Sequence, residues 1–230
     1  IVAFILVPAG HQGVNTELIN NLEKPYQAVE VVHPYVTHIL TDPEHDPILL
    51  KFAEEQLLNR EENRVKVFFS PSYLNGSDGV FDVPYYDLLV GMDLTVFPSY
   101  YEPWGYTPLE SLAFKVPSIT TTLAGFGLWV ETHYSKEHPG IDVISRDDRN
   151  NEAVVHEIAD KMKYIAALAP DKYLKYQENA KEVSRIALWE HLITYYHKAY
   201  EIALQKVALR IEDMPVNEAE EVAFIDKQMI

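Results

Sequence analysis

Cysteine is absent from this 230-residue chain, and basic residues are scarce. Without cysteine the chain forms neither disulfides nor thiolate metal sites, which is typical of the reducing cytoplasm, where we expect the protein to reside. The 19 lysines and arginines face 35 aspartates and glutamates, for a net charge of −16. Nucleic acids and anionic membranes are therefore poor partners, because either would need an extended basic surface. A neutral partner such as a sugar polymer fits the charge better.

Long apolar runs and metal-binding motifs are also missing. The first residues, Ile1–Val7, are apolar, but they are too few to span a bilayer and lack the charged flank of a signal peptide. They are typical of an interior strand, so we expect the chain to be a piece of a longer protein. His156 and Glu157 resemble the start of a zinc helix, but Asp160 stands where the second histidine is needed. We therefore expect no metal site and no metal cofactor.

Short apolar strands alternate with amphipathic helices as far as about residue 145. Runs of β-branched and aromatic residues predict strands at Ile1–Val7, Val65–Phe69, Leu94–Phe97, Pro117–Thr121 and Ile141–Ile144. Helical periodicity and helix-start residues predict helices over Asp46–Leu58, Pro84–Val90 and Thr107–Phe114. This alternation predicts an α/β fold with a mostly parallel sheet covered by helices on both faces.

Beyond about residue 150 the strand signals stop. The periodicity predicts three helices, with Pro170 separating the first two, over Asn151–Leu168, Asp171–Ser184 and Leu188–Leu209. From Arg210 the chain is acidic and only weakly apolar, which is typical of a docking segment or a disordered tail. We therefore predict one domain over residues 1–209 and a tail over 210–230.

The segment Phe97–Ser111 holds two glutamates in a loop that joins the end of a strand to the start of a helix. Ligands bind at such positions in open α/β sheets. Thr107 and Glu110 match a capping box, with Thr107 as N-cap and Pro108 at the first helical position, so capping by itself would account for Glu110. Glu102 precedes the helix in a loop rich in proline and glycine. There it has no capping role, which makes it the stronger functional candidate.

Aromatic side chains and backbone amides surround Glu102 in the sequence. The aromatic residues are Tyr100, Tyr101, Trp104 and Tyr106. Aromatic planes stack on the CH faces of sugar rings, and carboxylates accept hydrogen bonds from sugar hydroxyls. Tyr100 or Tyr101 taken alone would favour simple core packing, whereas the four rings together resemble a sugar site. The amides of Gly105, Tyr106 and Thr107 lie at a helix start, which favours a phosphate. The combination predicts a site for a sugar nucleotide.

The strings SYYEPWGYTPLES and VPSITTTLAGFG closely resemble the glycogen synthase family of the eukaryotic type. Supporting similarity in IVAFILVPAG, LTDPEHDPIL and NRVKVFFSPSYL extends it over roughly residues 1–145. The resemblance implies the C-terminal, Rossmann-like, nucleotide-sugar-binding half of a retaining glycosyltransferase of the GT-B architecture. The implied reaction transfers glucose from UDP-glucose or ADP-glucose to the non-reducing end of an α-1,4-glucan, and the implied partner within the protein is its own N-terminal domain.

The resemblance also implies a role for each site residue. Glu102 matches the glutamate beside the donor glucose and the reacting centre, and Glu110 matches the one that holds the ribose hydroxyls. Tyr85 stands where the family stacks a tyrosine on the nucleobase, although a tyrosine packed on its own helix would look the same. Trp104 lies beside the sugar pocket. The phosphate-contacting amides match Gly105, Tyr106 and Thr107.

Two departures from the family pattern limit these expectations. The arginine and lysine that the family uses for the diphosphate would precede Ile1, so we expect the isolated chain to bind nucleotide weakly and to lack turnover. The stretch Tyr164–Ser184 has lysines but no arginine where the family has an arginine-rich site for glucose 6-phosphate, which makes that regulation doubtful. The oligomeric state is left open.

Two other functions are compatible with the same residues. Glu102 and Glu110 could be the paired carboxylates of a glycoside hydrolase, which stand ~5–5.5 Å apart for retention and ~6.5–9.5 Å apart for inversion. The chain could also be a glucan-binding module without catalytic activity.

Overall fold

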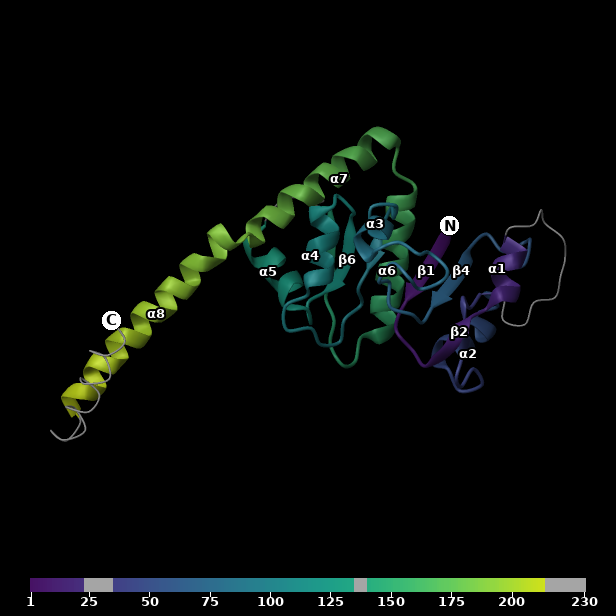
Figure 1. Ribbon diagram of the computed structural model, residues 1–230. Coiled ribbons are helices and arrows are strands. Elements are labelled where there is room, and N and C mark those ends of the chain that lie inside the picture. The colour runs from purple at the N-terminus through teal and green to yellow at the C-terminus, as the bar shows by residue number, and fades with distance from the viewer. Residues whose placement is uncertain (23–34, 135–139, 214–230) are drawn as a thin grey trace. The chain divides into compact units, whose positions relative to one another are not determined.

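The computed structural model describes residues 1–22, 35–134 and 140–213 and divides the chain into two compact units (Figure 1). Unit 1 is Ile1–Gly91 and unit 2 is Met92–Ile230. Both contain parallel strands and helices, and the last third of the described chain is helical, which confirms the predicted α/β class. A single domain over residues 1–209 stays a prediction.

Unit 1 is organised around two parallel strands that the sequence predicts. Strand β1 (Val2–Leu6) pairs with β4 (Lys66–Ser70), with Val2 opposite Lys66 and Leu6 opposite Ser70. Alternation along β4 directs Val67 and Phe69 into the core, because successive side chains of a strand face opposite sides. Their buried neighbours in this core are Tyr35, Val36, Leu40, Leu49 and Phe52.

The predicted helix over Asp46–Leu58 begins where expected and ends early. It is α2 (Pro47–Glu54), and the carboxylate of Asp46 accepts hydrogen bonds from two amides of its first turn. Such a side-chain cap stabilises a helix start by about 1 kcal/mol. Gln56 adopts a positive φ of 56°, so the chain leaves the helical conformation soon after Glu54.

The sequence analysis did not predict three short elements of unit 1. Strands β2 (His11–Val14) and β3 (His38–Leu40) form an antiparallel pair, and α1 (Thr16–Leu22) follows β2. Their polar residues and short lengths leave no periodic apolar pattern to detect. The predicted helix at Pro84–Val90 is present as α3 (Tyr85–Leu89).

Unit 2 is built on a three-stranded parallel sheet in the order β5–β6–β7, of which β6 is labelled in Figure 1. All three strands were predicted. They are β5 (Thr95–Val96), β6 (Ser118–Thr121) and β7 (Ile141–Ile144). Helix α4 (Tyr106–Ala113) joins the first two, and α5 (Gly125–His133) joins the last two.

Helices pack on both faces of this sheet. Ile141 of β7 joins a core with residues of α4, α5 and α7 (Pro170–Ser184). Ile144 faces the other side, where it packs with Ile119 of β6 and Val154 of α6 (Asn151–Ala166). All three of these side chains are at least 98% buried. The carboxyl ends of the strands thus form one edge of a sheet sandwiched between helices.

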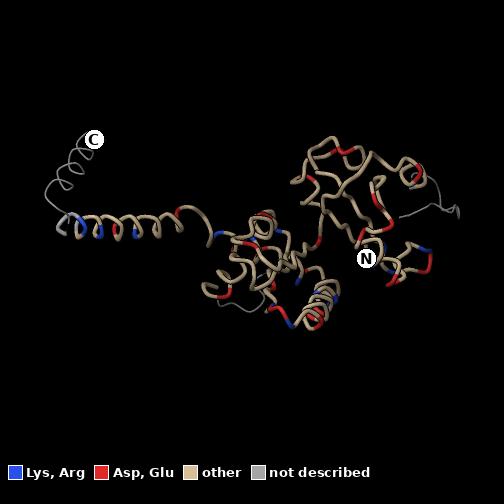
Figure 2. Tube along the Cα trace, turned by 90° about the horizontal axis from the view of Figure 1, so that it is seen from below, with Lys and Arg blue, Asp and Glu red and all other residues tan. Residues whose placement is uncertain are grey.

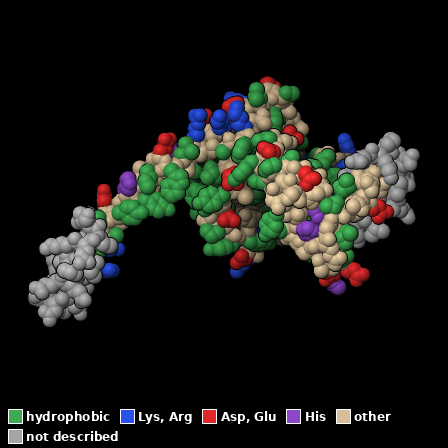
Figure 3. Space-filling view, in the orientation of Figure 1, with side chains coloured by type: hydrophobic (Ala, Val, Ile, Leu, Met, Phe, Trp, Pro, Cys, Tyr) green, Lys and Arg blue, Asp and Glu red, His purple; other side chains and the backbone are tan. Residues whose placement is uncertain are grey.

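The last predicted helix is longer than expected. After a short 3-10 turn, η1 (Arg185–Ala187), helix α8 runs over Trp189–Asp213, so the predicted tail 210–230 begins inside it and residues 214–230 lie outside the described part. Apolar side chains gather along α8 in Figure 3, and Tyr195 packs its ring 5.6 Å from that of Trp129. Within the described residues, every helix is too short or too polar to cross a bilayer.

Candidate functional site

The loop that carries Glu102 leaves the carboxyl end of β5 and is tied to the end of β6. The hydroxyl of Thr121 donates to the carbonyl of Ser99 at 2.7 Å. The amide of Glu102 donates to the carbonyl of Leu123 at 3.2 Å, and the carbonyl of Glu102 accepts from the amide of Gly125 at 3.0 Å. Three hydrogen bonds therefore fix the main chain on both sides of the Glu102 side chain, which is half-buried.

Gly125 allows this loop to lie directly against the start of α5. A Cβ atom at position 125 would lie 2.2 Å from the carbonyl oxygen of Pro103 and 3.2 Å from the Cα of Trp104. The amide of Phe126 donates to the carbonyl of Trp104 at 2.5 Å. Glycine is thus needed here for close approach of two main chains, a use of this residue that needs no unusual φ.

The predicted capping box at Thr107 is wrong. Helix α4 begins at Tyr106, and its N-cap is Gly105, whose left-handed φ of 102° turns the chain into the helix two residues early. Among the described residues, no side-chain cap hydrogen bond forms at this N-terminus. Thr107 is the second helical residue, and its carbonyl accepts a hydrogen bond from the Ser111 hydroxyl. Glu110 is the fifth helical residue, so capping does not account for it.

The uncapped start of α4 presents a concentrated set of hydrogen-bond donors. The first amides of any helix have no partner within it. Here these are the amides of Gly105, Tyr106 and Thr107, and in the described residues none of them donates to another group. The next residue is Pro108, which has no N–H. Three amides and the positive end of the helix dipole are thus available to an anion.

The aromatic side chains near Glu102 do not form one cluster. Tyr101 and Tyr106 are 83% and 67% exposed. Trp104 instead packs edge to face on Phe126 and Trp129, at centroid distances of 5.7 and 5.9 Å. Tyr100 is also 58% exposed. The expected sugar-binding group therefore divides into three solvent-facing tyrosines and a tryptophan that belongs partly to the core.

Arg146 lies under the same loop, although the sequence analysis did not single it out. It follows β7 by two residues, and its side chain is 93% buried. Its Nη1 donates to the carbonyl of Pro98 at 2.6 Å, and its guanidinium carbon lies 3.4 Å from the ring centroid of Tyr100. The available signal was a basic residue two positions after a predicted parallel strand, since the carboxyl ends of such strands share one sheet edge with the Glu102 loop.

Tyr85 lies in unit 1, at the first position of α3. Its side chain is half-buried, and its ring centroid lies 5.4 Å from that of Tyr86. The other predicted site residues all belong to unit 2. Tyr85 and Glu102 therefore lie in different units, and the contacts of each are those within its own unit.

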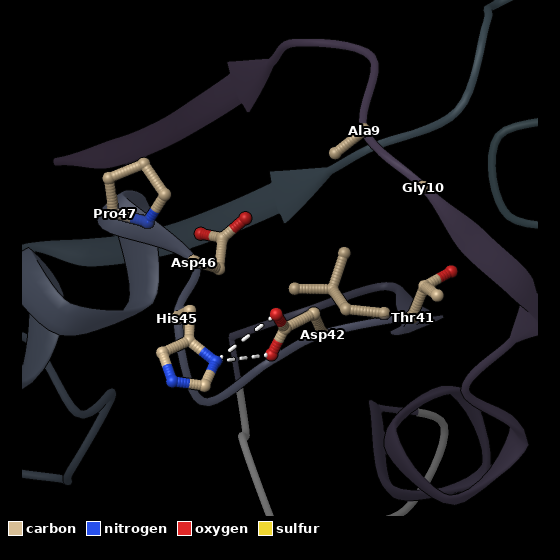
Figure 4. A pocket seen from close by; sticks show the side chains of 8 residues that line it. Ala9, Gly10, Thr41, Asp42, His45, Asp46 and Pro47 are labelled. Carbon is tan, nitrogen blue, oxygen red and sulfur yellow. Dashed lines mark hydrogen bonds and ion pairs between the residues drawn. The ribbon is translucent and has the colours of Figure 1, made fainter.

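Unit 1 has a pocket of about 290 Å³ near the start of α2 (Figure 4). Both oxygens of Asp42 contact Nδ1 of His45, at 2.9 and 3.1 Å, while Asp46 caps α2. These carboxylates are thus engaged in local structure. In the described residues, no three histidine, aspartate or glutamate side chains gather as metal ligands would. Acidic residues occur along both units, as the red segments of the trace in Figure 2 show.

Comparison with known proteins supports the family resemblance. The family model described as glycogen synthase matches residues 22–225. The chain is 32% identical over 216 residues to glycogen [starch] synthase isoform 1 of Saccharomyces cerevisiae, covering 85% of this chain and 30% of that protein. It is 34% identical over 175 residues to the Caenorhabditis elegans glycogen [starch] synthase, covering 76% and 26%.

The liver glycogen [starch] synthase of Mus musculus is 31% identical over 174 residues, which cover 75% of this chain and 25% of the mouse protein. The chain thus spans less than a third of the length of each of these relatives. The matched region includes the Glu102 loop, the start of α4 and the ends of β6 and β7. The chain belongs to the glycogen synthase family.

Proposed function

We propose that residues 1–209 form the donor-binding part of a cytoplasmic glycogen synthase. The full-length protein would transfer glucose from a nucleotide diphosphate glucose to the non-reducing end of an α-1,4-glucan, with retention at the anomeric carbon. One observation carries the proposal. Glu102 lies on a loop whose main-chain amide and carbonyl groups are hydrogen-bonded to the neighbouring elements, and it precedes a helix start with three available amides. Membership of the glycogen synthase family supports the reaction class.

The start of α4 suits the diphosphate of the donor. Three amides at Gly105, Tyr106 and Thr107 can donate to phosphate oxygens, and the helix dipole adds to this attraction. Glu110, one turn further along α4, would accept hydrogen bonds from the ribose hydroxyls. Tyr85 would stack on the base once the donor is bound. A stacking tyrosine accepts uracil or adenine, and family membership favours UDP-glucose.

Glu102 would act on the sugar. Breaking the bond to the leaving phosphate develops positive, oxocarbenium-like charge on the glucose ring, and a fixed carboxylate beside the ring stabilises that charge. The hydrogen bonds of its main chain to Leu123 and Gly125 hold the residue in place before the reaction, so little reorganisation is needed as charge develops. Trp104 would border the same sugar. The acceptor glucan would be held with the help of the protein's own N-terminal domain.

Glu102→Gln in the full-length protein tests the assignment, because it keeps the size of the side chain and removes its charge. We expect transfer of labelled glucose from UDP-glucose to glycogen to fall by ~100-fold or more in kcat, the scale of losing one electrostatic contact to a transition state. The KM for the donor should change far less, because the charge is needed chiefly after binding.

Glu131→Gln is the matched control, since Glu131 is an exposed glutamate on α5. Its kcat should equal that of the wild type. Near-normal transfer by the Glu102 variant would overturn the proposal. Release of glucose from glycogen without any nucleotide would instead favour a glycoside hydrolase, and glucan binding without nucleotide binding would favour a non-catalytic module.

A further inference from the structure

Arg146 joins the Glu102 loop to the end of β7 through several contacts at once. Its Nη1 donates to the Pro98 carbonyl at 2.6 Å, and its Nη2 donates to the side-chain oxygen of Asn151 at 2.8 Å. The hydroxyl of Tyr100 donates to the same Asn151 oxygen at 2.9 Å. The flat guanidinium also lies 3.4 Å from the centre of the Tyr100 ring. One side chain thus contacts two residues of the loop and the first residue of α6.

The charge of Arg146 is poorly compensated. Within the described part of the chain, Arg146 is 7% exposed, its Nε has no hydrogen-bond partner, and no carboxylate forms an ion pair with it. Its hydrogen-bond acceptors are a carbonyl and an amide oxygen, which are neutral. A buried cation without a counter-ion destabilises a fold. Fold stability alone therefore does not explain an arginine at this position.

The position of Arg146 gives it a specific effect on Glu102. The main chain of Glu102 is hydrogen-bonded to Leu123, which follows β6, and to Gly125, the first residue of α5. Arg146 holds the segment that leads into Glu102, since it contacts Pro98 and Tyr100, which precede Glu102 by four and two residues. Lysine could not replace it. A single ammonium group has neither the two separated donors that reach Pro98 and Asn151 nor the flat surface that stacks on the Tyr100 ring.

We propose that Arg146 is a positioning residue for the synthase reaction, holding the loop so that Glu102 faces the donor sugar. This inference rests on the proposed function, because it assigns Glu102 to the reacting centre. Arg146 itself would touch neither donor nor acceptor. Its loss would let the Pro98–Tyr100 segment shift, and a displacement of about 1 Å at a reacting group can lower a rate by ~100-fold.

The test measures kcat, donor KM and stability on three variants of the full-length protein. Arg146→Met keeps the apolar stem and removes the charge, Arg146→Lys keeps the charge and removes the fork, and Arg149→Met is the matched control at an exposed arginine. We expect both Arg146 variants to lose ~10- to 100-fold in kcat, with donor KM within about threefold of the wild type. Arg149→Met should keep wild-type kinetics.

Stability separates positioning from a purely structural role. Arg146→Met removes a buried charge without a counter-ion, which favours folding, and two donated hydrogen bonds, which opposes it. Its urea midpoint, followed by tryptophan fluorescence, should therefore stay within about 0.5 M of the wild-type value while kcat falls. Wild-type kcat in Arg146→Met would overturn the inference, and so would a kcat loss that parallels a loss of folded protein. If Glu102→Gln is inactive while Arg146→Met is fully active, only this inference fails; if Glu102→Gln is active, the proposed function fails.

Discussion

Replacement of Gly125 by alanine tests how closely the Glu102 loop packs on α5. The added Cβ would lie 2.2 Å from the carbonyl oxygen of Pro103 and 3.2 Å from the Cα of Trp104. Both are main-chain atoms, so no change of rotamer can relieve the overlap. Either the loop or the first turn of α5 must move, and the hydrogen bond from the Gly125 amide to the Glu102 carbonyl must lengthen.

The expected magnitude follows from three opposing effects. Overpacking of a well-packed site costs typically ~1–3 kcal/mol. Weakening one hydrogen bond adds up to ~1 kcal/mol. Alanine is favoured over glycine within a helix by up to ~1 kcal/mol, which acts in the opposite direction. We therefore expect Gly125→Ala to lower the free energy of unfolding by about 2 kcal/mol.

Tryptophan fluorescence is a suitable probe, because the three tryptophans, Trp104, Trp129 and Trp189, all belong to unit 2. With an m-value of roughly 2 kcal/mol per molar urea, a loss of that size lowers the urea midpoint by about 1 M. Leu128→Ala is the control on the same helix, since Leu128 is 52% exposed and should shift stability by less than ~0.5 kcal/mol. Without the close approach, alanine would stabilise the helix, so a midpoint at or above that of the wild type refutes the reasoning.

Two further predictions concern buried polar groups. Tyr176 donates its hydroxyl to Asp142 at 2.6 Å, and burial followed by the Asp142 charge raises the tyrosine pKa well above its ordinary value. Tyr176→Phe should destabilise unit 2 by ~1–3 kcal/mol, because the buried Asp142 carboxylate loses the donor to one of its oxygens and keeps only Lys161 on the other; a urea midpoint equal to that of the exposed-site control Tyr106→Phe would contradict this. In unit 1, burial lowers the pKa of His38 below its ordinary value of 6.5. The unfolded chain then binds more protons than the folded chain as pH falls through 6.5, so unit 1 loses stability below that pH. Titration of the His38 ring by NMR checks this, and a midpoint at or above 6.5 would be evidence against it.

Secondary structure could be predicted well wherever burial dictates the residue pattern. Strand β7 has the predicted bounds Ile141–Ile144, since the apolar run follows Gly140 and ends at a polar segment. The start of α4 could not be predicted, although Thr107 and Glu110 match a capping box. A local pattern of four residues was overridden by the left-handed turn at Gly105, which begins the helix earlier.

The candidate site could be predicted only in part. Glu102 was identified because it lies in a loop after a predicted strand, where no helix start needs a carboxylate as a cap. The groups that hold this loop are Thr121 at the end of β6, Gly125 at the start of α5 and Arg146 just beyond β7. Their contacts depend on the order of strands in the sheet, which residue periodicity does not specify. Arg146 in particular resembles an ordinary surface arginine until β7 is placed beside β6.

The loop around Glu102 is held mainly through carbonyl and amide groups rather than through its own side chains. Tyr101 and Tyr106 are exposed on this frame and contribute no side-chain hydrogen bond to it within the described residues. Replacement of either ring should therefore leave the main-chain path through Glu102 unaltered. The position of the glutamate is thus insulated from changes of side chain on the exposed side of its own loop.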